Sequence, residues 1–291
     1  MAEPTTITCI NGRFTAAHRA AVPVSDRGFR FGDGVFETIR LEGGVPYQWE
    51  LHLARLQQGL AAIGIRAPEV DWADLACRTI QRNRAREGFL RIAVSRGSGS
   101  RGYQPWPPGM PVTYVIEYLP AAPASDAPYR LWLSRWAKTP AQCLPVQMKL
   151  AQGMNSTLAS EEARAGECDD ALQLTTGGLL SETASANLFW IANGTLFTPS
   201  LECDCLNGTT RDAILRLSHL PVHTVALGLA ALEEAEAVAI ANVRLGLHPV
   251  SAILPMGWQY GIAHPEFARL REALKQDRAR YRKQHAAAWG A

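Results

Sequence analysis

The segment PVQMKLA, residues 145–151, sets Lys149 in the middle of an apolar run that is typical of a strand. The chain has only four lysines, and the other three lie in polar surroundings: Lys138 precedes Thr-Pro in an expected loop, and Lys275 and Lys283 lie among charged residues near the C-terminus. Burying an unpartnered ammonium costs free energy and favours its neutral form. Two interpretations of Lys149 stay open on this pattern alone: a lysine that points outward from an edge strand, or a buried amine suited to Schiff-base chemistry.

Two later segments favour the buried amine. Residues 178–190, GLLSETASANLFW, place Glu182 just before small residues and an expected strand. Such a carboxylate can keep the pyridine nitrogen of pyridoxal 5'-phosphate (PLP) protonated, which makes the ring an electron sink. Residues 206–211, LNGTTR, open an expected helix whose first amides and hydroxyls could hold a phosphate, although the same turn could be an ordinary helix cap. Together the three features predict a Schiff base between PLP and Lys149.

Composition is ordinary for a globular protein. The 291 residues are 47% hydrophobic and 19% charged, with a net charge of +2, so the chain is long enough for two modest domains and does not favour nucleic acid or a membrane surface as a partner. The six cysteines form no Cys-x-x-Cys pair, which argues against a metal site and favours free thiols. The first residues lack a basic region followed by an apolar run, and no stretch is apolar enough to span a bilayer, so we expect a cytoplasmic protein.

The pattern of elements predicts an α+β fold, because strands and helices mix without strict alternation. Apolar spacing and turn residues predict strands at 6–10, 35–41, 45–49, 89–95, 112–118, 129–136, 170–174 and 188–191. The same signals predict helices at 52–63, 71–83, 155–165, 210–217 and 265–285. The Pro- and Ala-rich stretch 119–128 is the expected linker between an N-terminal α/β domain, 1–118, and a C-terminal PLP-binding domain, 129–291.

Two other motifs do not support a function. Residues 97–102, GSGSRG, match the dinucleotide fingerprint, but three prolines within the next six residues exclude the helix that must follow it. His219 and His223 have a polar, loop-like context, which favours surface histidines over metal ligands.

The chain resembles the class IV aminotransferases, the fold-type-IV PLP enzymes. Residues 24–38, VSDRGFRFGDGVFET, resemble the N-terminal signature of that family, and residues 52–56, HLARL, resemble its phosphate-contacting helix. The resemblance covers nearly the whole chain and implies a smaller N-terminal and a larger C-terminal domain, PLP as cofactor and a homodimer. It implies that Lys149 carries the cofactor, that Glu182 meets the pyridine nitrogen, and that the phosphate is held by Arg55, Thr209, Thr210, Asn242 and Val243.

Within the family, residues 95–103, SRGSGSRGY, resemble the 4-amino-4-deoxychorismate lyases most, and the Phe-Glu-Thr ending at Thr38 favours the same group. This resemblance implies that Arg101 and Tyr103 bind substrate and that Thr38 is catalytic, although a solvated loop arginine and a structural hydroxyl are alternatives. An aminotransferase acting on D-amino or branched-chain amino acids stays open, since the Arg-Gly-x-x-x-Arg skeleton also occurs there. Residues 150–152, LAQ, replace the x-Leu-Asn that usually follows the lysine in the family.

Overall fold

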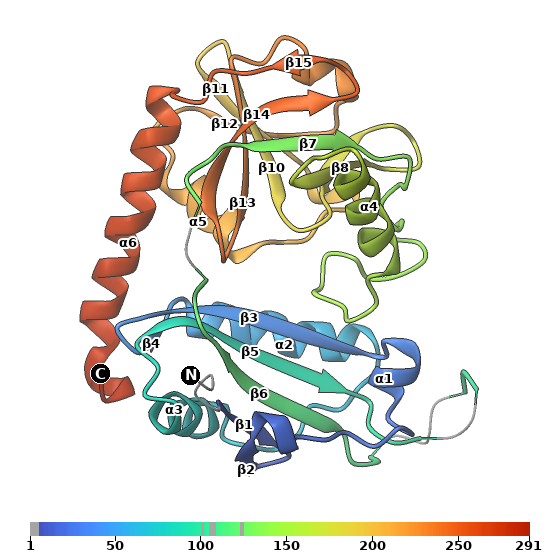
Figure 1. Cartoon of the computed structure of the whole chain (residues 1–291), viewed down its shortest axis with the longest axis vertical. Helices are drawn as coiled ribbons and strands as arrows, with labels where there is room; N and C mark the ends of the chain where they lie inside the picture. Colours follow the sequence, from blue (N-terminus) through green and yellow to red (C-terminus); the bar gives the residue numbers. More distant parts are fainter. Residues whose placement is uncertain (1–5, 100–101, 105–108, 123–124) are drawn as a thin grey trace. The chain divides into compact units, whose positions relative to one another are not determined.

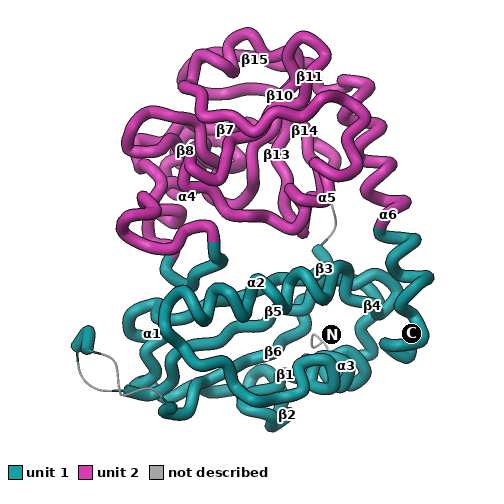
Figure 2. Tube along the Cα trace, turned by 180° about the vertical axis from the view of Figure 1, so that it is seen from behind, with its two compact units in different colours: residues 1–123, 148–152, 278–291 teal, residues 124–147, 153–277 magenta. Residues whose placement is uncertain are grey.

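The structure is a computed structural model that describes residues 6–99, 102–104, 109–122 and 125–291. The chain divides into two compact units (Figure 2). Unit 1 comprises residues 1–123, 148–152 and 278–291, and unit 2 comprises residues 124–147 and 153–277. Two short segments from later in the sequence thus belong to the first unit. The division is discontinuous, whereas the domains expected from sequence, 1–118 and 129–291 with a linker at 119–128, are consecutive.

Unit 1 is built on an antiparallel sheet with the strand order β2-β1-β6-β5-β3-β4 (Figure 1). The strands are β1 (Ile7–Ile10), β2 (Arg13–Ala16), β3 (Gly34–Glu42), β4 (Val45–Pro46), β5 (Glu87–Ser95) and β6 (Thr113–Leu119). Burial alternates along β3, with Val35, Glu37 and Ile39 buried and the residues between them half-buried, as expected for a strand whose two faces differ. Strands β3 and β5 pair over their whole length, and β5 pairs with β6 on its other side.

Two of the three α-helices that begin in unit 1 start at a capping aspartate. The short α1 (Arg27–Phe31) and α3 (Trp72–Arg82) are each capped by an aspartate, Asp26 and Asp71, whose carboxylates accept hydrogen bonds from backbone amides of the first turn. The longer α2 (Trp49–Ala62) lies along β3, and its Leu56 and Leu60 are buried in the core of the unit. A single turn of 3-10 helix (Ala17–Arg19) follows β2.

Unit 2 contains a ring of strands. The order β10-β13-β14-β7-β8-β9 returns to its start because β9 also pairs with β10, and β11, β12 and β15 extend this sheet. The strands are β7 (Tyr129–Leu133), β8 (Asp170–Leu174), β9 (Leu180–Thr183), β10 (Asn187–Ala192), β11 (Thr195–Pro199), β12 (Val222–Val225), β13 (Ala237–Asn242), β14 (Gly246–Leu254) and β15 (Trp258–Gln259). Closure leaves no free edge in the ring itself.

Three helices accompany this sheet. They are α4 (Met154–Ala165), α5 (Thr209–Leu217) and α6 (Pro265–Trp289), with short 3-10 turns at Leu201–Cys203 and Leu229–Leu232. In α6, Leu270 and Leu274 belong to the core of unit 2, and Trp289 belongs to the core of unit 1. The predicted α+β class is confirmed. Across the described part of the chain, none of the helices combines the length and apolarity that crossing a membrane requires.

The structure corrects three of the expected elements. The strand predicted at 45–49 ends at Pro46, because Gln48 takes a left-handed conformation (φ 56°) and α2 begins at Trp49. The strand predicted at 129–136 stops at Leu133. The run 145–151 is a turn followed by one isolated bridge, Val35 to Leu150, and not a regular strand. Apolar composition alone does not distinguish a strand from an irregular segment that packs against one.

Candidate active site

Lys149 is held beside β3 by backbone hydrogen bonds. The amide of Phe36 donates to the carbonyl of Lys149 at 2.9 Å, and the amide of Ala151 donates to the carbonyl of Gly34 at 2.9 Å. This register puts Lys149 opposite Phe36, and the Lys149 Nζ lies 4.5 Å from the centroid of the Phe36 ring. Lys149 is half-buried. This burial is intermediate between the two possibilities that the sequence left open, an outward-pointing lysine and a buried amine.

Thr38 shares this face of the strand. Residues two apart on a strand point to the same side, so Thr38 lies on the face of Phe36, over which the Lys149 amine is placed. Both Phe36 and Thr38 are half-buried, whereas Glu37 between them is buried on the opposite face. The backbone of β3 therefore presents a hydroxyl and an aromatic ring together on the side of the lysine.

The opposite face of β3 carries a buried charged cluster with α2. Arg55 binds the Glu37 carboxylate with two nitrogens, Nε to Oε1 and Nη2 to Oε2, each at 2.7 Å. His52 Nδ1 lies 2.7 Å from Glu37 Oε2. Burial would raise the pKa of Glu37, but the hydrogen bonds from Arg55 and His52 outweigh it and lower the pKa to about 2. Arg55, the expected phosphate ligand, is thus fixed in orientation by a bidentate ion pair.

The surroundings of His52 lower its pKa and so favour its neutral form. Burial lowers its pKa most, and the positive charges of Arg55 and Lys149 lower it further, against the opposing effect of Glu37. A neutral ring beside an ionised carboxylate must donate through Nδ1, which fixes its tautomer.

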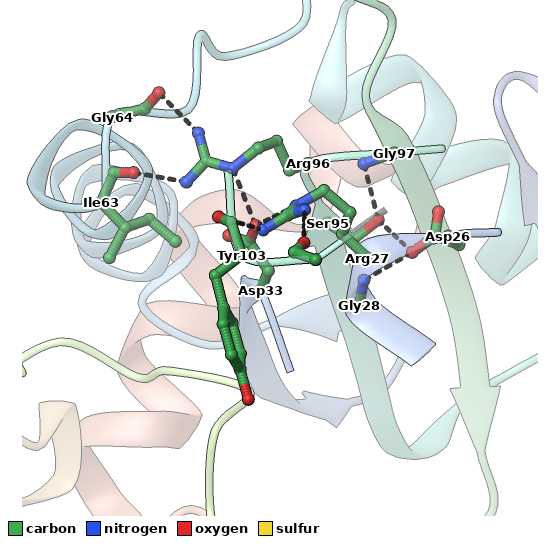
Figure 3. Close-up of polar contacts among 11 residues, drawn as sticks. Asp26, Arg27, Gly28, Asp33, Ile63, Gly64, Ser95, Arg96, Gly97 and Tyr103 are labelled. Atoms are coloured by element: carbon green, nitrogen blue, oxygen red, sulfur yellow. Dashed lines mark hydrogen bonds and ion pairs between the residues drawn. The ribbon is translucent and has the colours of Figure 1, made fainter. Parts of the chain in front are cut away.

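A second network in unit 1 ties the segment that contains the expected substrate residues to the sheet (Figure 3). Asp33 Oδ2 accepts hydrogen bonds from Arg27 Nε at 2.7 Å and from Arg96 Nε at 2.8 Å. The two terminal nitrogens of Arg27 donate to the carbonyls of Gly102 at 2.9 Å and Tyr103 at 3.1 Å. Arg27 is buried, so these contacts anchor the backbone at Gly102 and Tyr103.

The Tyr103 side chain has few contacts with its surroundings. The Tyr103 ring is 85% exposed, and its centroid lies 5.3 Å from that of Phe31. Arg96 extends the network to the end of α2 by donating to the carbonyls of Ile63 at 2.7 Å and Gly64 at 3.0 Å. Arg101 lies outside the described residues, so its expected substrate contact stays a prediction.

In unit 2, Glu182 lies at the centre of a polar cluster. Its Oε1 accepts a hydrogen bond from Lys138 Nζ at 2.7 Å, and its Oε2 accepts one from Asn187 Nδ2 at 3.0 Å. Asn187 Nδ2 also donates to the carbonyl of Leu206 at 2.9 Å. Lys138, expected from sequence in a loop with polar surroundings, does lie outside regular structure, but its side chain is only 12% exposed.

The N-terminus of α5 adjoins this cluster. Gly208 is its N-cap residue and has no side chain to occupy the first-turn amides, and Thr209 and Thr210 are both buried. A Cβ at Gly208 would lie 2.1 Å from Asn187 Oδ1. Asn187 thus contacts the carboxylate at one end and the start of α5 at the other. The two groups expected to meet the pyridine nitrogen and the phosphate are neighbours in one unit.

The turn between β13 and β14 is organised by Asn242. Its Oδ1 accepts hydrogen bonds from the amides of Arg244 at 2.9 Å and Leu245 at 2.8 Å, and its Nδ2 donates to the carbonyl of Ser185 at 3.1 Å. Ser185 lies in the turn that joins Glu182 to Asn187. The expected phosphate-binding turn, Asn242 with Val243, is therefore connected to the Glu182 segment.

The sequence profile described as amino-transferase class IV matches residues 34–253 of the chain, about three quarters of its length. The chain belongs to the class IV aminotransferase family. The predicted family is thereby confirmed.

Both activities considered from sequence occur among its relatives. The chain is 31% identical to the aminodeoxychorismate lyase of Vibrio harveyi, over 80% of this chain and 87% of that protein. It is 27% identical to the branched-chain-amino-acid aminotransferase of Salmonella typhimurium, over 91% of this chain and 90% of that protein. Of solved structures, the T.th. branched-chain amino acid aminotransferase with pyridoxamine 5'-phosphate matches with a TM-score of 0.87 and 26% identity, covering 96% of this chain and 97% of that one. The predicted fold-type-IV architecture is confirmed, and that bound molecule is the amine form of the predicted cofactor.

The residues present fit PLP chemically. An amine on Lys149, a carboxylate on Glu182, and two threonines at a helix start without a side-chain cap are the donors and acceptors that an aldehyde, a pyridine nitrogen and a phosphate require. Arg211 in the first turn of α5 adds a buried Nε that has no hydrogen-bond partner among the described residues. The described residues contain no cluster of three or more His, Cys, Asp or Glu side chains that could hold a metal ion.

Sequence reasoning assigned no role to four residues that organise these sites: Glu37, Arg27, Lys138 and Asn187. The contact of Asn187 could have been predicted from sequence, because Asn187 lies only five residues after Glu182, the carboxylate that it binds. Lys138 is 44 residues from Glu182 along the chain, and no local pattern predicts such a pair.

Proposed function

We propose that this chain is a PLP-dependent 4-amino-4-deoxychorismate lyase, which eliminates pyruvate to give 4-aminobenzoate for folate synthesis, and that it acts as a cytoplasmic homodimer. The observation that carries the proposal is the register of Lys149 with β3, which puts Thr38 on the same face as the lysine amine. A hydroxyl beside the amine suits an elimination, in which one group removes a proton and another can protonate the leaving group. The similarity to the Vibrio harveyi lyase supports the same reaction.

The proposed roles follow from the chemistry of each side chain. Bound PLP supplies an electron sink for the charge that develops when a substrate carbon loses its proton. The Lys149 amine holds the cofactor and then takes that proton, and Thr38 protonates the departing enolpyruvyl group. Glu182 holds the pyridine nitrogen, and Arg101 and Tyr103 bind the substrate, with Arg101 on a carboxylate. The phosphate is held by Arg55, Thr209, Thr210, Asn242 and Val243.

A transaminase is the second candidate, and the similarity to the Salmonella typhimurium aminotransferase supports it. In that reaction the Lys149 amine returns the proton to the cofactor, and no leaving group departs. A transaminase converts the cofactor to its amine form when an amino acid is added without an acceptor, so loss of the visible absorbance is expected in that case. A lyase with its own substrate keeps its absorbance through many turnovers.

The first experiment tests the lysine. The purified protein is reduced with borohydride and digested, and the peptide that carries the reduced cofactor is identified by mass spectrometry. Modification of Lys149 is expected, and none in Lys149→Ala, while the exposed control Lys275→Ala remains modified. A protein without visible absorbance that is not modified would be a catalytically silent member of the family.

The second experiment separates the two reactions. Incubation with 4-amino-4-deoxychorismate is expected to release pyruvate and 4-aminobenzoate in equal amounts. Thr38→Val is expected to lower kcat at least tenfold with the cofactor spectrum unchanged, and Thr38→Ser to retain most of the activity. Absence of both products, together with conversion by a branched-chain or D-amino acid, would establish the transaminase instead.

A further inference from the structure

Lys138 forms a nearly dry ion pair with the carboxylate proposed to meet the cofactor. The Nζ of Lys138 and the Oε1 of Glu182 are 2.7 Å apart, and the two side chains are 12% and 8% exposed. The backbone amide of Lys138 donates to the carbonyl of Leu174 at 2.9 Å, which anchors the residue to β8. At such low exposure the pair is weakly screened by water, so its charges act strongly on whatever binds beside them.

The two oxygens of Glu182 have different partners. The ammonium of Lys138 occupies Oε1, and the neutral amide of Asn187 occupies Oε2. Asn187 Nδ2 also donates to the carbonyl of Leu206, so the amide has a fixed place beside the carboxylate. One oxygen of the carboxylate is therefore paired with a cation and the other with a neutral donor.

Other groups near the carboxylate respond to its charge. Burial raises the pKa of the Cys205 thiol to about 12, and the negative charge of Glu182 adds to that effect. The pKa of Arg211 is lowered by burial, and the charges of Cys205, Asp212 and Glu182 oppose this. Lys138 is in hydrogen-bond contact with the carboxylate itself, whereas these groups act on it through space.

A structural anchor is the alternative explanation for the pair. A buried ion pair is a poor source of stability, because the cost of removing two charges from water offsets their attraction. A neutral amide donor at position 138 could make the same hydrogen bond but would leave the charge of the Glu182 carboxylate uncompensated. The positive charge at this place therefore acts on the charge of Glu182, which is an electrostatic role.

We propose that Lys138 is a positioning residue that sets the net charge Glu182 presents to the pyridine nitrogen of PLP. The inference rests on the proposed role of Glu182. A carboxylate that already accepts a charged hydrogen bond presents less negative charge to a second partner. The positive charge of Lys138 would thus weaken the electron sink of bound PLP, and it would lower the proton affinity of the Lys149 nitrogen when this is condensed with the cofactor aldehyde.

The test is a pH titration of the visible absorbance of the bound cofactor, which requires no substrate. In Lys138→Gln, which keeps a hydrogen-bond donor and removes the charge, the midpoint is expected to rise by about half to one pH unit. Lys138→Met is expected to shift it in the same direction. Lys138→Arg keeps the charge and is expected to titrate like the wild type, as is the surface control Lys275→Gln.

A structural anchor predicts a different pattern. Lys138→Gln would then bind the cofactor as the wild type does, and Lys138→Met would bind it more weakly, with neither midpoint moved. An unchanged midpoint in a cofactor-loaded Lys138→Gln protein overturns the inference and leaves the proposed function untouched. Wild-type protein with no cofactor absorbance overturns the proposed function and this inference with it.

Discussion

Glu37 shows how one side chain can couple a strand to the helix beside it. Its carboxylate is buried on β3 and is bound by Arg55 and His52, both of which come from α2. Because an unpaired buried charge is costly, each member of the cluster depends on the others. The same pairing orients Arg55, the proposed phosphate ligand.

Glu37→Gln is expected to destabilise the protein at neutral pH by about 3 kcal/mol, from the difference between its pKa of about 2 in the fold and an ordinary value of 4.5. Since the pKa is lowered on folding, this stabilisation is complete above about pH 4.5 and is lost as the pH falls toward 2. Urea unfolding should show that the difference in the free energy of unfolding between wild type and variant becomes smaller as the pH falls over this range. The exposed control Glu69→Gln should change stability little. A difference in the free energy of unfolding that does not vary with pH would contradict the role given to the Glu37 carboxylate.

Arg27 is a residue whose effect should appear in substrate binding. It reaches Gly102 and Tyr103 with two nitrogens while a third binds Asp33, a geometry that lysine cannot reproduce. Arg27→Lys is expected to raise the KM several-fold and to leave the cofactor spectrum unchanged. Arg30→Lys, an exposed neighbour on α1, is the control. Equal KM values in the two variants would show that this contact does not position the substrate segment.

At the scale of elements, the start of α5 is shaped by what surrounds it. The φ of Gly208 is −74°, which any residue can adopt. Glycine is required here only because there is no room for a side chain. Its neighbour Asn187 is held by Glu182 and Leu206 and cannot move aside without losing those hydrogen bonds. The strand β10, which begins at Asn187, therefore sets the position of the helix N-terminus.

Gly208→Ala is expected to weaken cofactor binding at least tenfold and to destabilise the protein by about 1–3 kcal/mol, because its Cβ would overlap Asn187 Oδ1. Gly153→Ala is the matched control, since Gly153 is the N-cap of α4 and a Cβ there meets nothing within 4 Å. Cofactor titration and thermal unfolding measure the two effects. Equal cofactor affinity in both variants would show that the start of α5 does not bind the phosphate.

At the scale of the whole molecule, unit 1 is assembled from three separate stretches of chain. Trp289 from the end of α6 packs against Trp49, with ring centroids 5.1 Å apart, and Leu150 packs against the same core. Residues 1–123 include the whole sheet of the unit but lack both of these side chains.

A fragment of residues 1–123 is expected not to fold cooperatively, because it loses the core contacts of 148–152 and 278–291. Removing a buried aromatic side chain alone costs about 3–5 kcal/mol, which is a large part of the stability of a small domain. Near-ultraviolet circular dichroism and urea unfolding measure whether the fragment folds cooperatively, with the full chain as the reference. A sharp, cooperative transition in the fragment would contradict the division.

The sequence by itself determined the family, the helices α2 to α6 to within a few residues, and most of the longer strands, because apolar periodicity and capping residues are local signals. It also singled out Lys149, Glu182 and the start of α5 through the order of their chemical types. Only the tertiary structure decided that Lys138 pairs with Glu182, that Glu37 binds Arg55, and that β9 closes the ring onto β10. These contacts join residues by their positions in the fold, and their energies depend on burial and exact distance, which no local pattern of residues records.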